Sequence, residues 1–185
     1  MAAQPTPRRF TVDEYYRMGK SGILAENDRV ELIEGEVFQM PPIGDLHAWC
    51  INRLTELFVL GLAGGAIVAV QNPLRLSTFS EPVPDLVVMR RRPALRGPHP
   101  TARDVFLVIE VSDTSLRHDQ RVKLPIYARE GVPEVWIVDL RAERMLVYRD
   151  PSEGGYRISL IVGRSDPISP AAFPELVLTG DQILG

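Results

Sequence analysis

The sequence predicts a mixed α/β fold in which helices flank one β-sheet. Short apolar runs rich in valine and isoleucine, which are typical of buried strands, recur between residues 85 and 162. Helical spacing of apolar residues is clearest between His47 and Phe58, and a second helical stretch, from Arg117 to Glu130, separates two groups of strands. The order helix, strands, helix, strands indicates a mixed sheet of the α/β or α+β class.

The composition indicates one globular domain over residues 1–185, with 45% hydrophobic and 24% charged residues. No apolar stretch reaches the about 20 residues of a membrane span, because glycines interrupt the longest one, from Phe58 to Val70. The N-terminus lacks the order of a signal peptide, and the single cysteine, Cys50, excludes an internal disulfide. We therefore expect a cytoplasmic protein that does not contact a membrane.

The N-terminal region is expected to form a helix and a hairpin. Thr11 and Glu14 fit a capping box that opens a helix to about Met18. Residues 29–40 have the pattern of two strands around a Glu34-Gly35 turn, and two prolines end the second strand.

The next helix has one apolar face, with Asp45 as a candidate N-cap and the glycines of residues 61–65 as its end. The residues of that face are His47, Cys50, Ile51, Leu54, Leu57 and Phe58. After this helix, strands are expected at residues 66–70, 74–76, 85–89, 105–111, 134–139, 144–148 and 156–162. The helix of residues 117–130 contains Pro125, so it must start late or bend there, and the C-terminal segment is expected to end in a short strand or turn.

Two carboxylates mark two of the apolar strands. Glu110 lies near the end of the run Phe106 to Val111, where a lone buried carboxylate must be paired, protonated or bound to a metal. Asp85 lies at the start of the run that ends at Met89. If these strands are antiparallel neighbours, the two carboxylates meet at one edge of the sheet. At about 5 Å they would repel by roughly 3 kcal/mol, which a divalent cation would turn into attraction.

The helix after Glu110 supplies a candidate cation. Asp119, Lys123 and Tyr127 are each four residues apart and would share one face of that helix. An ammonium beside a metal-bound water could position it or stabilise charge that develops on a phosphate.

Several longer strings resemble the Uma2 family of endonucleases (DUF820), which is part of the PD-(D/E)xK nuclease superfamily. The resemblance covers about residues 10–150, and its most specific part is the string from Val108 to Leu140. The strings are RVELIEGEVFQM, PVPDLVVM, VIEVSDTSLRHDQRVKLPIYAREGVPEVWIVDL and MLVYR.

The resemblance implies a restriction-endonuclease-like core and Mg²⁺- or Mn²⁺-dependent cleavage of nucleic acid, with DNA favoured as the substrate. It implies that Asp85, Glu110 and the carbonyl of Val111 hold the metal. The superfamily places its lysine two residues after the glutamate, where this chain has Ser112, so the resemblance points to Lys123 of the following helix instead.

The resemblance also implies a further acidic residue near the metal. Glu31 is the first candidate, and Glu34 and Glu36 compete with it. Weaker candidates for nucleic-acid contact are His47, Arg90, Arg91, Arg92 and Tyr127. A homodimer or a higher homo-oligomer is expected from the apolar content and the helix surfaces.

Simpler interpretations of these residues stay open. Asp85 follows Pro84 and is common in such turns, Glu110 could pair with an arginine, and Lys123 could be a solvated helix residue. On the same fold, the rival functions are a non-catalytic protein that binds nucleic acid or a partner, and a metal-dependent phosphodiester hydrolase that acts on small molecules.

Overall fold

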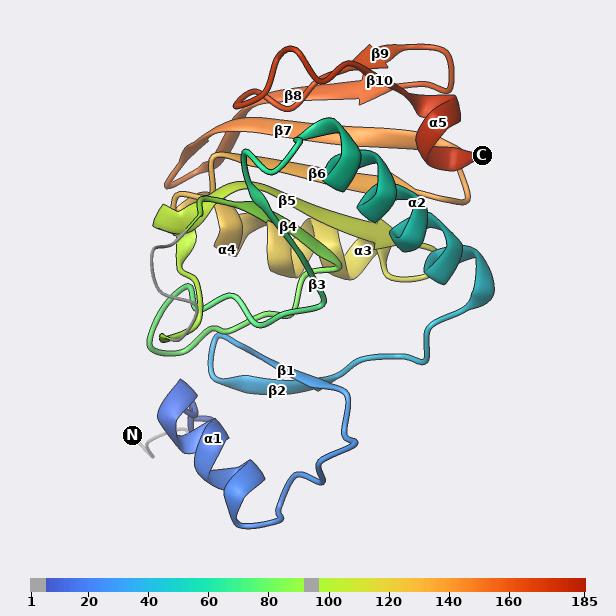
Figure 1. The fold of residues 1–185 in the computed structure, drawn as a ribbon. Helices are drawn as coiled ribbons and strands as arrows, with labels where there is room; N and C mark the ends of the chain where they lie inside the picture. The colour runs from blue at the N-terminus through green and yellow to red at the C-terminus, as the bar shows by residue number, and fades with distance from the viewer. Residues whose placement is uncertain (1–5, 92–96) are drawn as a thin grey trace.

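The computed structural model describes residues 6–91 and 97–185 of the chain. Its centre is a six-stranded sheet with the order β3-β4-β5-β6-β7-β8, antiparallel throughout except for the parallel pair β5 and β6 (Figure 1). The strands are β3 (Ile67–Val70), β4 (Leu86–Met89), β5 (Val105–Ser112), β6 (Glu134–Asp139), β7 (Arg144–Ser152) and β8 (Gly155–Val162). A 3₁₀ turn, η1 (Ala102–Asp104), precedes β5.

Each face of the sheet is covered by a helix, as Figure 1 shows. α2 (Asp45–Gly61) packs Leu54 and Phe58 against the face that carries Ile109 and Trp136. On the other face, Tyr127 packs with residues that include Val108 and Ile137. Because side chains alternate along a strand, Glu110 of β5 points to the same side as Val108, toward the helix that carries Tyr127.

The connection from β5 to β6 is one helical stretch with an unusual middle. It consists of α3 (Leu116–His118), a π-helical turn, η2 (Asp119–Lys123), and α4 (Leu124–Arg129). In the π turn the N–H of Leu124 donates to the carbonyl of Asp119, five residues earlier. The helix was predicted to start late or bend at Pro125. Instead, the chain forms a widened turn that ends at Lys123, two residues before the proline.

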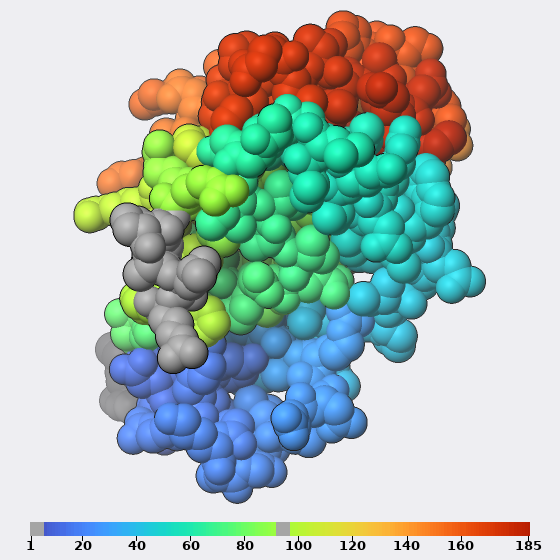
Figure 2. All heavy atoms as spheres, viewed as in Figure 1, coloured from blue at the N-terminus to red at the C-terminus, as the bar shows by residue number. Residues whose placement is uncertain are grey.

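The N-terminal residues form α1 (Val12–Lys20) and the hairpin of β1 (Val30–Ile33) and β2 (Glu36–Gln39), with the predicted capping box and turn. Glu34 and Gly35 have φ angles of 50° and 85°, as a tight hairpin turn requires. An antiparallel bridge between Leu32 and Glu81 ties the hairpin to the segment that precedes β4. With all atoms drawn, the N-terminal and C-terminal residues lie at opposite ends of the molecule (Figure 2).

Three local predictions were wrong. Residues 74–76 are no strand, although Leu74 is buried. Gly44 is the N-cap of α2, and Asp45 is its first residue, where its charge still favours the helix N-terminus. The C-terminal segment contains short strands, β9 (Pro167–Ile168) and β10 (Leu178–Thr179), but it ends in the short helix α5 (Gly180–Leu184) instead of the expected strand or turn.

The predicted fold class is confirmed: a mixed sheet is flanked by helices and preceded by an N-terminal hairpin. Within residues 6–91 and 97–185, no helix is both long enough and apolar enough to cross a membrane.

The packing of α2 on the sheet can be tested at Phe58. Its ring is fully buried and lies edge-on to the ring of Trp136, with 5.8 Å between the ring centroids. We expect Phe58→Ala to lower the free energy of unfolding by about 3–5 kcal/mol, because it leaves a cavity under the helix. The neighbouring Val59 is 52% exposed, so Val59→Ala should change the free energy of unfolding by less than about 1 kcal/mol. Denaturant unfolding measures both, and equal losses would contradict this packing.

Candidate active site

A pocket of about 400 Å³ lies where Asp85, just before β4, and the end of β5 come together beside the hairpin. One wall is formed by the connection from β2 to α2, and the opposite wall by the connection from β5 to α3. The polar side chains that line it are Arg29, Glu31, Gln39, His47, Gln71, Asp85, Glu110, Asp113, Thr114, Ser115, His118, Asp119 and Lys123. The pocket is therefore built from segments that are far apart in the sequence.

Asp85 is positioned by the pairing of β4 with β5. Leu86 pairs with Ile109, so the next position along the two strands places Asp85 opposite Glu110. One carboxylate oxygen of Asp85, Oδ2, accepts a hydrogen bond from the N–H of Val111 at 2.8 Å. The other, Oδ1, lies 3.0 Å from Nε2 of His47 and accepts a hydrogen bond from the side chain of Gln71 at 3.3 Å.

Glu110 is only 3% exposed, and its carboxylate is held by two side chains of the following helical stretch. Tyr127 donates its hydroxyl proton to Oε1 of Glu110 at 2.6 Å. Nζ of Lys123 donates to the same oxygen at 3.2 Å. The buried carboxylate is thus paired with a lysine, whereas the simpler interpretation expected an arginine.

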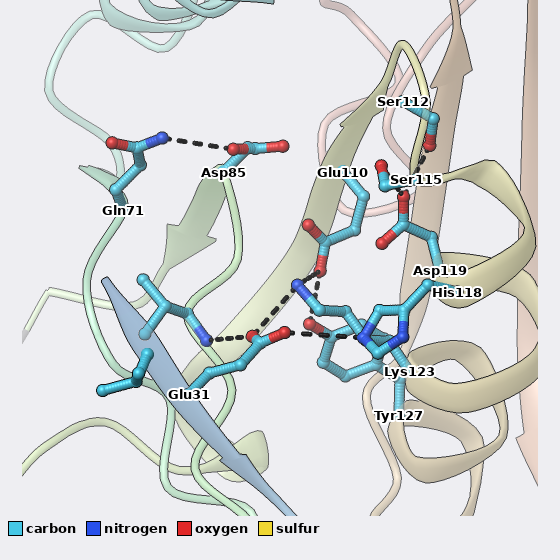
Figure 3. A network of polar contacts seen from close by, with 12 residues as sticks. Glu31, Gln71, Asp85, Glu110, Ser112, Ser115, His118, Asp119, Lys123 and Tyr127 are labelled. Carbon is cyan, nitrogen blue, oxygen red and sulfur yellow. Dashed lines mark hydrogen bonds and ion pairs between the residues drawn. The ribbon is translucent and has the colours of Figure 1, made fainter. Parts of the chain in front are cut away.

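Lys123 lies between two carboxylates from different parts of the chain (Figure 3). Its Nζ is 3.2 Å from Oε1 of Glu110 and 3.1 Å from Oε2 of Glu31, and its side chain is 7% exposed. Glu31 also accepts a hydrogen bond from the N–H of Val83 at 3.1 Å, and its second oxygen lies 3.6 Å from Nε2 of His118. The ammonium therefore joins the hairpin to the central strand.

Of the three glutamates that competed for this place, the structure puts Glu31 in the pocket. Glu31 is 2% exposed, whereas Glu36 is exposed and Glu34 forms an ion pair with Arg129 at the surface.

The π turn brings a further acidic residue into the pocket. The Oδ2 atom of Asp119 accepts hydrogen bonds from the hydroxyls of Ser112 and Ser115, both at 2.7 Å. Ser112, two residues after Glu110, thus fixes the helical stretch that carries Lys123. A π turn turns the chain by less per residue than an α-helix, so side chains four residues apart align more closely, and Asp119 and Lys123 are both buried toward the site.

The charges of this cluster are unbalanced toward the negative. Burial raises the pKa of Glu110 to about 8, and the charges of Asp119 and Asp85 add to the effect, although Lys123 opposes it. Burial alone would lower the pKa of Lys123, but the charges of Glu110 and Glu31 outweigh it and raise that pKa. One ammonium therefore does not fully offset the carboxylates around it.

Asp85 and Glu31 keep their charge through local partners. Burial favours a higher pKa for Asp85, but the hydrogen bond with His47 outweighs it, and the pKa of Asp85 is lowered. The same contact raises the pKa of His47. For Glu31, contacts with His118 and Lys123 outweigh burial and lower the pKa. Glu110 is thus the carboxyl of the cluster that most needs additional positive charge.

The chemistry of these donors fits Mg²⁺. Within residues 6–91 and 97–185, no cluster of three or more His, Cys, Asp or Glu side chains is arranged to hold a metal. Mg²⁺ does not need one, because it is usually held by one or two carboxylates together with water and substrate phosphates. Asp85 and Glu110 supply two carboxylates, and a divalent cation beside them would favour the charged form of Glu110, which burial disfavours.

The weaker candidates have different places in the structure. His47, expected more as a core histidine, lies in the pocket on Asp85. Tyr127 donates a hydrogen bond to Glu110 and is only 1% exposed, so its side chain cannot contact nucleic acid. This burial corrects the prediction that Tyr127 binds nucleic acid. Arg90 and Arg91 lie beyond the far end of β4, where they bond to the backbone of Arg103 and Gly64. Arg92 lies outside the described residues.

Gln71 and His118 were missed by sequence analysis. Gln71 follows β3 with a φ angle of 50°, and only the pairing of β3 with β4 brings it to Asp85. His118 directly precedes the π turn, and its spacing of five residues from Lys123 would not place it on the same face of a regular α-helix, so the sequence held no signal for it.

Comparisons with known proteins agree with this architecture. The Uma2 family, described as "Putative restriction endonuclease", matches residues 12–180. A crystal structure of a "putative nuclease belonging to DUF820" from Anabaena variabilis is similar to this chain, with a TM-score of 0.73 and 18% sequence identity. The match covers 95% of this chain and 97% of that chain, and at this identity it supports the shared fold alone. The search of curated proteins found no match.

Replacing Lys123 tests the buried ion pairs. Lys123→Met leaves Glu31 and Glu110 buried without their ammonium, so we expect the free energy of unfolding to fall by about 3–5 kcal/mol at pH 8. Lys20 is the other lysine of the chain and is exposed, so Lys20→Met is the matched control and should be nearly neutral. Urea unfolding of both variants measures the difference, and an undiminished stability of Lys123→Met would contradict the pairing.

The raised pKa of Glu110 predicts a pH dependence of stability. Between pH 4.5 and about 8, folded Glu110 binds more protons than the unfolded chain, so stability should fall as the pH rises. His47, whose pKa is also raised, adds a fall in stability only near and above 6.5, the ordinary pKa of a histidine. In the presence of a chelator, the Tm of the wild type should decrease from pH 5 to 6.5, and that of Glu110→Gln should decrease less. Parallel curves for the two proteins would show that Glu110 does not titrate in this range.

Proposed function

The chain belongs to the Uma2 family, and we propose that it is a Mg²⁺- or Mn²⁺-dependent endonuclease that hydrolyses phosphodiester bonds in DNA. One observation supports this proposal most: a lysine lies between two buried glutamates, beside an aspartate on the neighbouring strand, at the base of a pocket. Acidic ligands for a hard cation next to an ammonium are the groups that phosphate-ester hydrolysis needs.

In this proposal Asp85, Glu110 and the carbonyl of Val111 would hold the metal. When bound, Mg²⁺ would polarise the phosphate and lower the pKa of a bound water. Asp85 is oriented for such a role by His47 and Gln71, and Glu110 by Tyr127. These partners hold the carboxylates in place before any ligand arrives, so little reorganisation is needed on binding.

Lys123 would act on the substrate rather than on the metal. Its ammonium keeps its charge, because Glu110 and Glu31 raise its pKa. A fixed positive charge at the base of the pocket would stabilise the negative charge that develops on a phosphate during hydrolysis. Glu31 is a positioning residue in this scheme, since it holds Lys123 from the side opposite to Glu110.

The proposal includes a single nuclease domain over residues 1–185 that acts as a homodimer in the cytoplasm. Apolar side chains at the sheet edge support self-association, because Ile158, Leu160 and Ile161 of the edge strand β8 are 45–67% exposed. Cys50 is a free, buried thiol, as is common in a reducing compartment.

A second candidate is a non-catalytic protein that binds nucleic acid or a protein partner through the same pocket. The presence of Ser112 in the superfamily's lysine position favours it, because Ser112 is engaged with Asp119 and cannot supply a cation. This candidate predicts ligand binding without cleavage. A small-molecule phosphodiester hydrolase would be distinguished from a nuclease by a panel of substrates.

The endonuclease proposal predicts linked losses of metal binding and cleavage. Wild-type protein should bind Mn²⁺ in calorimetry and cut DNA in its presence. We expect Asp85→Asn and Glu110→Gln to lower the metal affinity and the cleavage rate by at least about 10-fold to 100-fold, because each removes one carboxylate from the cation. Chelator should abolish the cleavage.

The hairpin supplies the control. Glu36 is exposed and outside the pocket, so Glu36→Gln should keep the wild-type metal affinity and rate. Equal product yields from wild type and Asp85→Asn would contradict the endonuclease proposal and favour the binding protein.

A further inference from the structure

The depth and the lining of the pocket indicate whether a single strand or a duplex of DNA fits it. The groups at its base are nearly inaccessible: Glu31, Glu110, Asp119 and Lys123 are 2–6% exposed. A phosphate must therefore enter the pocket to reach them. The volume of about 400 Å³ is within the range of sites for small molecules, about 300–1,000 Å³, and suits one nucleotide.

One wall of the pocket is apolar and includes an aromatic ring. Its residues come from the end of β2 and the connection to α2, and they are Phe38, Met40, Pro41, Pro42 and Ile43. This wall is held in place, because Arg29 donates to the carbonyl of Pro41 at 2.7 Å and the N–H of Met40 donates to the carbonyl of Arg29 at 2.8 Å. The pocket is thus formed before a ligand binds.

Phe38 is placed beside the catalytic cluster by strand pairing. It is the direct cross-strand partner of Glu31, so its ring is on the same face of the hairpin as the carboxylate that holds Lys123. The ring also lies 5.3 Å from the ring of His118, measured between centroids, which limits its motion. The ring of Phe38 and the ammonium of Lys123 are therefore placed to contact the base and the phosphate of one nucleotide.

Inside the pocket, acidic side chains outnumber permanently charged basic ones. Glu31, Asp85, Glu110, Asp113 and Asp119 line the pocket, against the permanent cations Arg29 and Lys123. Contacts of many Lys and Arg residues with phosphates supply most of the affinity of proteins that bind duplex DNA without sequence preference. Such contacts are scarce inside this pocket, so a nucleotide that enters it must be held there by another interaction, and stacking of its base on an aromatic side chain supplies one.

We propose that the substrate is an unpaired DNA strand, from which one nucleotide enters the pocket and stacks its base on Phe38. This inference rests on the proposed endonuclease function. A base in a duplex is stacked and paired, so it can reach Phe38 only after it leaves the helix, which costs a few kcal/mol per nucleotide. An unpaired strand does not need this energy and should be the preferred form.

The test compares one end-labelled oligonucleotide, alone and annealed to its complement, with Mn²⁺ present. We expect kcat/KM to be at least about 10-fold higher for the single strand, from the unpairing energy that the duplex must supply. KM for the single strand should also change by less than about 10-fold between 50 and 200 mM salt, since few phosphates are neutralised.

Variants at Phe38 test the stacking itself. Phe38→Leu keeps an apolar side chain but loses the aromatic face, so KM for the single strand should rise about 10-fold, while kcat and the affinity for Mn²⁺ stay near wild type. Phe38→Tyr keeps the ring and should restore KM. Normal Mn²⁺ affinity in Phe38→Leu shows that the site is intact.

Three results would overturn the inference. A duplex cut as fast as the single strand would exclude the preference for unpaired DNA, and an unchanged KM in Phe38→Leu would exclude stacking. Cleavage of neither form would overturn the endonuclease proposal and this inference with it, whereas the first two results would leave the endonuclease proposal standing.

Discussion

The ammonium of Lys123 is the constraint on which the site depends. It is buried, and it contacts carboxylates from two segments that are about 80 residues apart, Glu31 of the hairpin and Glu110 of the central strand. Burying any of these charges alone would cost several kcal/mol, so each one requires the others. The same contacts that give the pocket its chemistry therefore hold the hairpin against the sheet.

The lysine reaches this place because the crossing helix is locally widened. Pro125 cannot donate a backbone hydrogen bond. The π turn from Asp119 to Lys123 ends two residues before this proline. π turns of this kind are frequent at functional sites, where they redirect side chains. Here the turn buries Asp119 and Lys123 toward the strand that carries Glu110, and Ser112 fixes it through Asp119. The proline that the sequence marked as an interruption of the helix thus lies next to the turn that places Lys123 in the site.

Much of the architecture follows from local pattern. The β-branched runs predict the strands of the sheet, because that signal depends only on local pattern. The meeting of Asp85 and Glu110 was expected only on the condition that their strands are antiparallel neighbours, and the pairing of β4 with β5 meets that condition. The hairpin turn and the capping box are equally local. Other predictions failed. The N–H groups of residues 74–76 bond to the carbonyls of Pro82, Pro100 and Ser80 rather than to one neighbouring strand, and α5 is too short for a periodic signal. His47 has the spacing of a core residue, and only the position of α2 over the end of the sheet brings it to Asp85. Gln71 has no signal before β3 pairs with β4.

The central claim of the proposed function is that a divalent cation binds between the carboxylates of Asp85 and Glu110. A crystal soaked in Mn²⁺ tests it most directly, because manganese is located by its own anomalous signal. The account predicts one strong peak within bonding distance of the carboxylates of Asp85 and Glu110 and of the carbonyl of Val111. A fully soaked crystal without a peak there, or with Lys123 moved into that position, would contradict it.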